Sequence, residues 1–179
     1  LKDQQISSMV ESLGTLLRAT LSNKKPLVSL DYEIGLAGSY MTIQKIRFED
    51  RLLFHVECPE ELGKALILPL TIQPLLENAI RYGMEEMMDT CEISIRTRKE
   101  GTLLIVEVSN EGSVFEDSLL EKLQDGTKNA HGFGIGLVNI HQRIQMLFGD
   151  SYGLSFKNQD EKAIAIITIP YKTEEDDYA

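Results

Sequence analysis

The chain has 179 residues, with 18 Lys and Arg against 28 Asp and Glu, so its formal net charge is −10 and its pI is near 4.8. A composition that is 42% hydrophobic and 26% charged is typical of a globular domain and argues against a disordered chain. The acidic balance also argues against a nucleic-acid binder, because binding to phosphate backbones needs clustered Lys and Arg. Two cysteines, Cys58 and Cys91, give neither a disulfide framework nor a metal spacing, which favours a reducing, cytosolic setting.

The first predicted element is an amphipathic helix over Gln4–Leu21. Its apolar seam indicates half of a helical hairpin or a dimer contact, with packing on the chain's own domain as the alternative. The chain begins with Leu1 rather than Met, which suggests a piece of a longer protein. The seam consists of residues that recur in steps of three and four: Ile6, Met9, Val10, Leu13, Leu16, Leu17 and Leu21.

The rest of the chain mixes helices and strands without the regular alternation of a doubly wound parallel sheet. Asp31 is the predicted N-cap of the second helix, and the Lys99–Gly101 turn joins two strands as a hairpin. This order predicts an α+β two-layer sandwich, in which helices cover one face of a mixed sheet of about five strands. Helices are predicted over Tyr32–Glu49, Pro69–Gly83 and Ile135–Phe148, and strands over Leu52–Cys58, Cys91–Arg98, Leu103–Ser109, Gly153–Lys157 and Ala163–Ile169.

The helix over Pro69–Gly83 carries the first candidate site. Pro74, Asn78, Arg81 and Tyr82 share a face that differs from the apolar stripe. An amide oxygen beside an Arg and an aromatic ring suits Mg²⁺, phosphate and a purine ring. The alternative is a solvated face on which Glu77 pairs with Arg81 and Asn78 is incidental.

The second candidate is the glycine-rich run His131–Leu137. Gly132, Gly134 and Gly136 lead directly into a helix, whose N-terminus presents free N–H groups and a positive dipole to an anion. The spacing differs from dinucleotide-binding and Walker loops. Residues 123–130 before it are polar and are interpreted as a lid. A glycine-rich hinge without a ligand is the alternative.

Three ordered motifs resemble those of LytS/YesM-like sensor histidine kinases, whose catalytic domains have the Bergerat (GHKL) ATP-binding fold. Tyr40–Phe48 looks like the family's Y-x-x-I-Q-x-x-R-F helix, Gln73–Gly83 like its N-box, and Gly132–Ile140 like its second glycine box. The resemblance covers nearly the whole chain. It implies phosphoryl transfer from ATP to a histidine nitrogen, with ATP and Mg²⁺ as cofactors.

The resemblance also implies residue roles. Asn78 would hold Mg²⁺ against the ATP phosphates, Arg81 would contact phosphate, and Tyr82 would lie near the adenine. Glu77 is a candidate proton acceptor or water-orienting residue. The backbone of the glycine box would bind the triphosphate at Gly132, Gly134, Gly136 and Leu137.

Two features depart from the family pattern. The first glycine box normally reads D-x-G-x-G, and its Asp accepts a hydrogen bond from the adenine amino group. Here Asn110 (or Ser109) precedes Gly112, and a neutral amide accepts more weakly than a carboxylate. No histidine precedes His55, so we expect the phosphoacceptor upstream of Leu1 and no autophosphorylation by this chain alone.

The prediction is therefore the ATP-binding catalytic domain of a bacterial two-component sensor histidine kinase. Residues 1–25 would be the second helix of a dimerisation and phosphoacceptor hairpin, 26–172 the catalytic domain, and 173–179 an acidic tail. Expected partners are ATP or ADP, the upstream phosphoacceptor helix, a response regulator and a second copy in the full-length homodimer. The domain would be cytoplasmic in a membrane-anchored protein. The alternatives are a nucleotide-deficient docking module and an anti-sigma-type serine kinase on the same fold.

Overall fold

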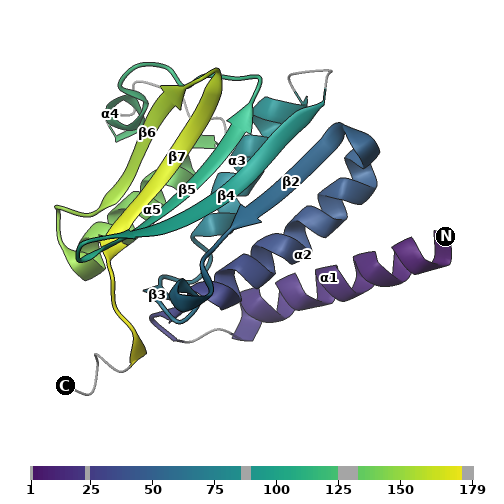
Figure 1. The fold of residues 1–179 in the computed structure, drawn as a ribbon, viewed down its shortest axis with the longest axis horizontal. Helices are drawn as coiled ribbons and strands as arrows, with labels where there is room; N and C mark the ends of the chain where they lie inside the picture. Colours follow the sequence, from purple (N-terminus) through teal and green to yellow (C-terminus); the bar gives the residue numbers. More distant parts are fainter. Residues whose placement is uncertain (1, 23–24, 86–89, 125–132, 175–179) are drawn as a thin grey trace.

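The computed structural model describes residues 2–22, 25–85, 90–124 and 133–174. Its helices and strands follow one another along the chain as Figure 1 shows. The helices are α1 (Lys2–Ser22), α2 (Leu30–Phe48), α3 (Ile72–Ile80), α4 (Leu119–Gln124) and α5 (Phe133–Phe148), and the strands are β1 (Val28–Ser29), β2 (Leu52–Glu57), β3 (Leu66–Ile67), β4 (Cys91–Glu100), β5 (Leu103–Glu111), β6 (Gly153–Gln159) and β7 (Lys162–Pro170).

A mixed five-stranded sheet in the order β2-β4-β5-β7-β6 forms one layer. β2 and β4 are parallel, whereas the other neighbours are antiparallel. β4 and β5 form the predicted hairpin around Gly101, with Glu100 opposite Leu103. Helices α3 and α5 lie behind this sheet in Figure 1, whereas α2 lies beside its β2 edge and α1 runs along α2 farther from the sheet. The prediction of an α+β two-layer sandwich is confirmed.

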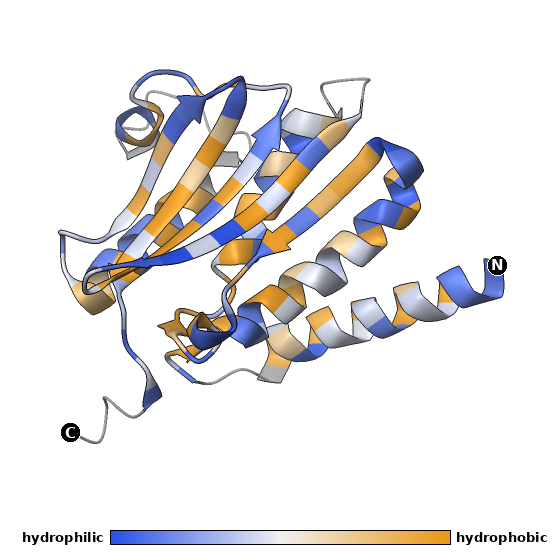
Figure 2. Cartoon of the chain, in the orientation of Figure 1, coloured by the Kyte–Doolittle hydropathy of each residue, from blue (hydrophilic) through white to orange (hydrophobic). Residues whose placement is uncertain are grey.

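The core lies between the sheet and these helices. Every second residue of β4 and β7 is buried along most of each strand, as expected for strands that bury only one face. Figure 2 shows hydrophobic residues distributed along the strands of the sheet. The buried face of the sheet packs against the apolar stripes of α3 and α5. The residues at the centre of the core include Ile93, Ile95, Val106, Ile167, Leu75, Leu76, Ile140 and Ile144.

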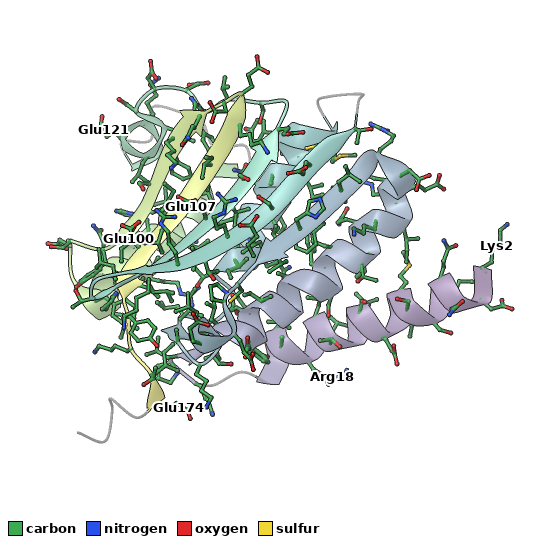
Figure 3. All side chains as sticks on the ribbon, viewed as in Figure 1. Lys2, Arg18, Glu100, Glu107, Glu121 and Glu174 are labelled. Carbon is green, nitrogen blue, oxygen red and sulfur yellow. The ribbon has the colours of Figure 1, made fainter. Side chains whose placement is uncertain are left out.

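The opposite face of the sheet is open and charged. Figure 3 shows Glu107 near its centre, where the carboxylate pairs with Arg98 at 2.9 Å and Lys157 at 3.4 Å. Lys162 bridges Glu92 and Glu111 on neighbouring strands. Such opposite-charge pairs across strands keep the bare face soluble and favour the observed register.

The start of α2 differs from the prediction. The helix begins at Leu30, and its N-cap is Ser29, whose hydroxyl accepts a hydrogen bond from the Tyr32 backbone N–H at 3.2 Å. Asp31 instead lies in the first turn, so its assignment as N-cap is wrong. The reason is that Val28 and Ser29 pair with Leu66–Ile67 as a short antiparallel strand, which holds Ser29 in an extended conformation.

Helix α1 has two apolar faces rather than one. Ser12 and Ala19 are buried and Met9 and Leu16 are partly buried, whereas a second face is 50–80% exposed. Because α1 packs against α2, part of the predicted seam is covered by the chain's own helix. The exposed residues are Ile6, Val10, Leu13, Leu17 and Leu21.

Candidate functional site

Asn78 lies in α3 and is only 4% exposed. The sequence predicted that Asn78 lies on a face of this helix separate from the buried apolar stripe. The near-complete burial of Asn78 shows that this face is also buried at that position. The Asn78 side-chain oxygen Oδ1 is fully buried and has no hydrogen-bond partner among the residues that the structure describes. A buried carbonyl oxygen without a partner is costly, and a ligand that coordinates oxygen would relieve that cost. The amide is therefore suited to hold Mg²⁺, which accepts Asn as a ligand in phosphoryl-transfer sites.

The start of α3 is fixed by a carboxylate from α2. Glu33 is 1% exposed, and its two oxygens accept hydrogen bonds from the backbone N–H groups of Leu70, Thr71 and Ile72 at 2.7–3.2 Å. Burial raises the pKa of the Glu33 carboxyl, although these bonds and the nearby Arg143 oppose the rise. The first free N–H groups of a helix attract negative charge. Glu33 thus sets where α3 begins, less than two turns before Asn78.

Helix α3 ends in a π-helical turn over Arg81–Glu85. Arg81 is exposed and Tyr82 is partly buried. The turn brings Gly83 against β4 and β5: a Cβ at this position would lie 2.5 Å from Cys91 Sγ and 3.4 Å from Asn110 Nδ2. Any larger side chain would clash there, so the glycine lets the end of the N-box-like helix approach the sheet closely.

Asn110 and Gly112 lie at the end of β5. Asn110 is 3% exposed, and its Nδ2 donates to the Glu111 backbone oxygen at 3.1 Å and to the Ser113 hydroxyl at 2.8 Å. Gly112 has φ +80°, a conformation that side chains other than glycine rarely adopt. The polar residue and the tight turn therefore lie beside the end of α3.

A strap after this turn runs along the edge strand β6. The Asn158 side chain accepts from the Phe115 N–H at 2.7 Å and donates to the Phe115 carbonyl at 2.8 Å. The Phe115 and Phe156 rings meet edge to face with centroids 4.9 Å apart. Sequence reasoning missed this strap, because its contacts join residues more than 40 positions apart and leave no local pattern.

The described part of the predicted second glycine box lies at the N-terminus of α5. The helix begins at Phe133, so Gly134 and Gly136 lie in its first turn. A Cβ on Gly136 would meet no atom within 4 Å, and packing thus does not require this glycine. The Leu137 side chain belongs to the core and is not available to a ligand. His131 and Gly132 lie outside the described residues.

The remaining candidates are placed as follows. Glu77 is exposed and its Oε1 accepts from Gln73 Nε2 at 2.9 Å. His55 is exposed. Among the residues that the structure describes, no group of three or more His, Cys, Asp or Glu could hold a metal ion. The carboxyl end of α3, the end of β5 and the beginning of α5 all lie toward the same edge of the sandwich, the upper one in Figure 1.

Comparisons with known proteins match both halves of the chain. Residues 1–52 match the histidine kinase family model. Residues 63–173, which include α3, β5 and α5, match the model of histidine kinase-, DNA gyrase B-, and HSP90-like ATPases. The chain belongs to this ATPase family. The predicted resemblance to LytS/YesM-like sensor kinases is confirmed by the relatives that follow.

The sensor histidine kinase YesM of Bacillus subtilis (strain 168) is 41% identical over 174 residues, which cover 97% of this chain and 29% of YesM. The sensor histidine kinase BtsS of Escherichia coli (strain K12) is 31% identical, with 96% and 29% coverage. The chain thus spans less than a third of the length of these curated relatives. No helix within the described ranges has both the length and the apolar character needed to cross a membrane.

Solved structures confirm the fold. The catalytic domain of histidine kinase ThkA has a TM-score of 0.63 and 19% identity, covering 80% of this chain and 93% of that domain. ThkA in complex with the response regulator protein TrrA has a TM-score of 0.59, with 19% identity and coverage of 93% and 49%. At this identity the likeness concerns the fold alone.

His141 on α5 is a structural residue that makes stability depend on pH. It is buried, and its Nδ1 accepts a hydrogen bond from the Leu154 N–H at 3.0 Å. Burial lowers the pKa of this imidazole. As pH falls through about 6.5 the unfolded chain binds the proton and the folded chain resists it, so folding stability falls.

We therefore expect the free energy of unfolding to decrease below pH 6.5 by at most about 1.4 kcal/mol per pH unit. Urea titrations of wild type and His141→Gln between pH 5 and 8 will measure this. The variant should lose the slope in this window. An identical pH dependence in both proteins would assign the effect to other groups.

Proposed function

We propose that the chain is the ATP-binding catalytic domain of a bacterial two-component sensor histidine kinase. It would transfer the γ-phosphoryl of ATP to a histidine on an upstream helix. The observation that carries the proposal is the buried, unpartnered Oδ1 of Asn78, in a chain that belongs to an ATPase family. The relatives support the kinase, and the comparisons give no support to a docking module or an anti-sigma-type kinase.

Different residues would bind different parts of the nucleotide. Asn78 would hold Mg²⁺, which when bound neutralises charge on the phosphates. Arg81, exposed one turn later, would contact phosphate, and the N–H groups at the beginning of α5 would bind phosphate oxygens. Tyr82 and Asn110 would border the adenine. Exposed Glu77, next to Asn78 in the chain, would be the proton acceptor.

Calorimetric titration of ADP into the chain, with and without Mg²⁺, tests the proposal. Phosphoryl transfer depends mainly on positioning and charge neutralisation, so a competent domain must first bind nucleotide. We expect saturable binding that tightens with Mg²⁺. No heat at high micromolar ADP would favour the nucleotide-deficient docking module instead.

The partners follow from the same proposal. The chain would act with a response regulator, as the relatives' class of protein and the ThkA complex with TrrA suggest. It would be the cytoplasmic domain of a membrane-anchored protein. The two free thiols, Cys58 and Cys91, fit a reducing compartment.

We further propose that the exposed face of α1 mediates dimer formation. Its five apolar residues are 50–80% exposed and lie in steps of three and four along about four turns of the helix. An apolar surface of this kind favours association, but a single helix face buries little area and binds weakly. We therefore expect a concentration-dependent equilibrium between monomer and dimer in sedimentation.

Leu13→Glu should abolish the dimer, because a carboxylate in the interface is costly to desolvate. Ser7→Glu is the matched control, since Ser7 is exposed on the polar side of the same helix, and it should leave the equilibrium unchanged. A wild-type chain that stays monomeric at all concentrations would contradict this role of α1.

A further inference from the structure

The amide of Asn110 could offer a nucleotide base either a donor or an acceptor, because it carries both Nδ2 and Oδ1. Which atom it offers decides what it can recognise. Adenine presents an amino group at its 6-position, whereas guanine presents an oxygen there. A carboxylate at this position would be acceptor-only, so an amide needs a second element to fix its orientation.

The structure contains such an element. Nδ2 of Asn110 lies 3.1 Å from the Glu111 backbone oxygen and 2.8 Å from the Ser113 hydroxyl. A carbonyl oxygen can only accept, so the amide atom that faces it must be the nitrogen. The two bonds use both protons of Nδ2. The remaining atom, Oδ1, is the one left for a ligand.

The position of Ser113 is itself well determined. Gly112, with φ +80°, turns the chain so that the Ser113 hydroxyl reaches back to Asn110. Two residues later, Phe115 is held to β6 by both polar ends of the Asn158 side chain. The hydroxyl therefore lies between two fixed points rather than in a free loop.

The surroundings fit a base better than a triphosphate. A groove at this end of the sheet is lined by Gly83, Cys91, Gly112 and Ser113, and by the acidic residues Glu111, Asp160 and Glu161. Carboxylates repel phosphate groups. Phosphates would therefore lie away from this groove, toward Asn78 and α5. Asn110 does not line the groove itself, but its Nδ2 lies beside the groove residues Gly83 and Ser113, so we place the base on this side.

We propose that Ser113 is a positioning residue that presents Oδ1 of Asn110 to the base and makes the site selective for purines with a 6-amino group. This inference rests on the proposed nucleotide site. In this site, the Ser113 hydroxyl holds Nδ2 of Asn110, so the amide oxygen faces the base and accepts a hydrogen bond as a carboxylate would.

Competing titrations of the chain with ADP and with purine riboside 5′-diphosphate test the selectivity. The two ligands differ only in the 6-amino group. We expect ADP to bind roughly 5- to 150-fold more tightly, because the analogue leaves Oδ1 without its partner. Equal affinities would overturn this inference but not the proposed function. No binding of either nucleotide would overturn both.

Substitutions at position 113 test the positioning role. Ser113→Ala should reduce the preference for ADP over the analogue by roughly 2- to 13-fold, because the amide loses one of its two anchors. Ser113→Thr keeps the hydroxyl and should restore the preference. Ser155→Ala removes an exposed hydroxyl on β6 and should change nothing. An unchanged preference in Ser113→Ala would overturn the role of Ser113.

Asn110→Asp provides a second, independent test. Both oxygens of a carboxylate are acceptors, so its orientation does not matter and this variant should keep the ADP preference. For the same reason, adding Ser113→Ala to Asn110→Asp should not reduce that preference. A loss of preference in the double variant equal to that in Ser113→Ala alone would show that Ser113 acts on the base without Asn110. If Ser113→Ala does not fold, a loss of the ADP preference in Asn110→Asp would overturn the inference.

Discussion

Asn78→Ala is expected to weaken binding of ATP in the presence of Mg²⁺ by roughly 100-fold, which is the cost of losing an interaction with a charged group. The ligand-free protein should hardly change in stability. Oδ1 makes no hydrogen bond with the described part of the chain, so no donor there loses its acceptor when this oxygen is removed. We expect the free energy of unfolding to change by no more than about 1 kcal/mol. Calorimetry with and without Mg²⁺ and urea unfolding measure the two quantities.

The control for Asn78 is Gln44→Ala. Gln44 lies in α2 and also has a buried side-chain oxygen without a hydrogen-bond partner among the described residues. Gln44→Ala therefore removes the same kind of amide from a partly buried position in another helix. Nucleotide binding should stay at the wild-type level in this variant. Asn78→Asp should keep binding but alter its dependence on Mg²⁺ concentration. A large loss of ligand-free stability in Asn78→Ala would mean that the residue serves packing.

The sheet was predictable because its strands bury one face only. Cys91–Glu100 shows this as an alternation of apolar and polar residues, which is the period-two signal of a half-buried strand. Lys162–Pro170 also buries every second residue, but it carries Ile or Ala on both faces, so its sequence is a nearly continuous apolar run. The two short strands were not predicted, because two residues are too few to show a period; they are Val28–Ser29 and Leu66–Ile67. They nevertheless decide which residue caps α2. Without them the local sequence does not separate Asp31 from Ser29, and the N-cap was assigned to Asp31.

The candidate site was predictable only in part. Asn78 was singled out because an Asn in a helix interior has poor propensity, but its burial depends on how α3 packs and not on its own sequence. The Ser113 and Asn158 contacts depend on the fold bringing distant residues together. Glu33 did leave a signal: an acid among Leu30, Ala37 and Met41 on one helical stripe indicates a buried carboxylate with a partner elsewhere.

That carboxylate is the basis of the second large expected effect. Glu33→Ala should reduce the free energy of unfolding by about 2–4 kcal/mol, because it leaves the N–H groups of Leu70, Thr71 and Ile72 without an acceptor in a buried helix terminus. The positive φ of Leu70, +57°, adds to this dependence, since a strained residue persists only where its surroundings hold it. Urea unfolding at pH 7 measures the loss.

Glu33→Gln separates the hydrogen bonds from the charge. One oxygen of Glu33 serves Leu70 and the other serves Thr71 and Ile72, so an amide can satisfy only one of the two sides, and the loss should be smaller, about 1 kcal/mol. Glu11→Ala, at an exposed carboxylate on α1, should cost less than about 0.5 kcal/mol. Equal small losses in Glu33→Ala and Glu11→Ala would mean that water replaces the carboxylate and that α3 begins at Ile72 without it. If the carboxylate does hold the helix, Glu33→Ala should also weaken ADP binding, since Asn78 then loses its fixed position.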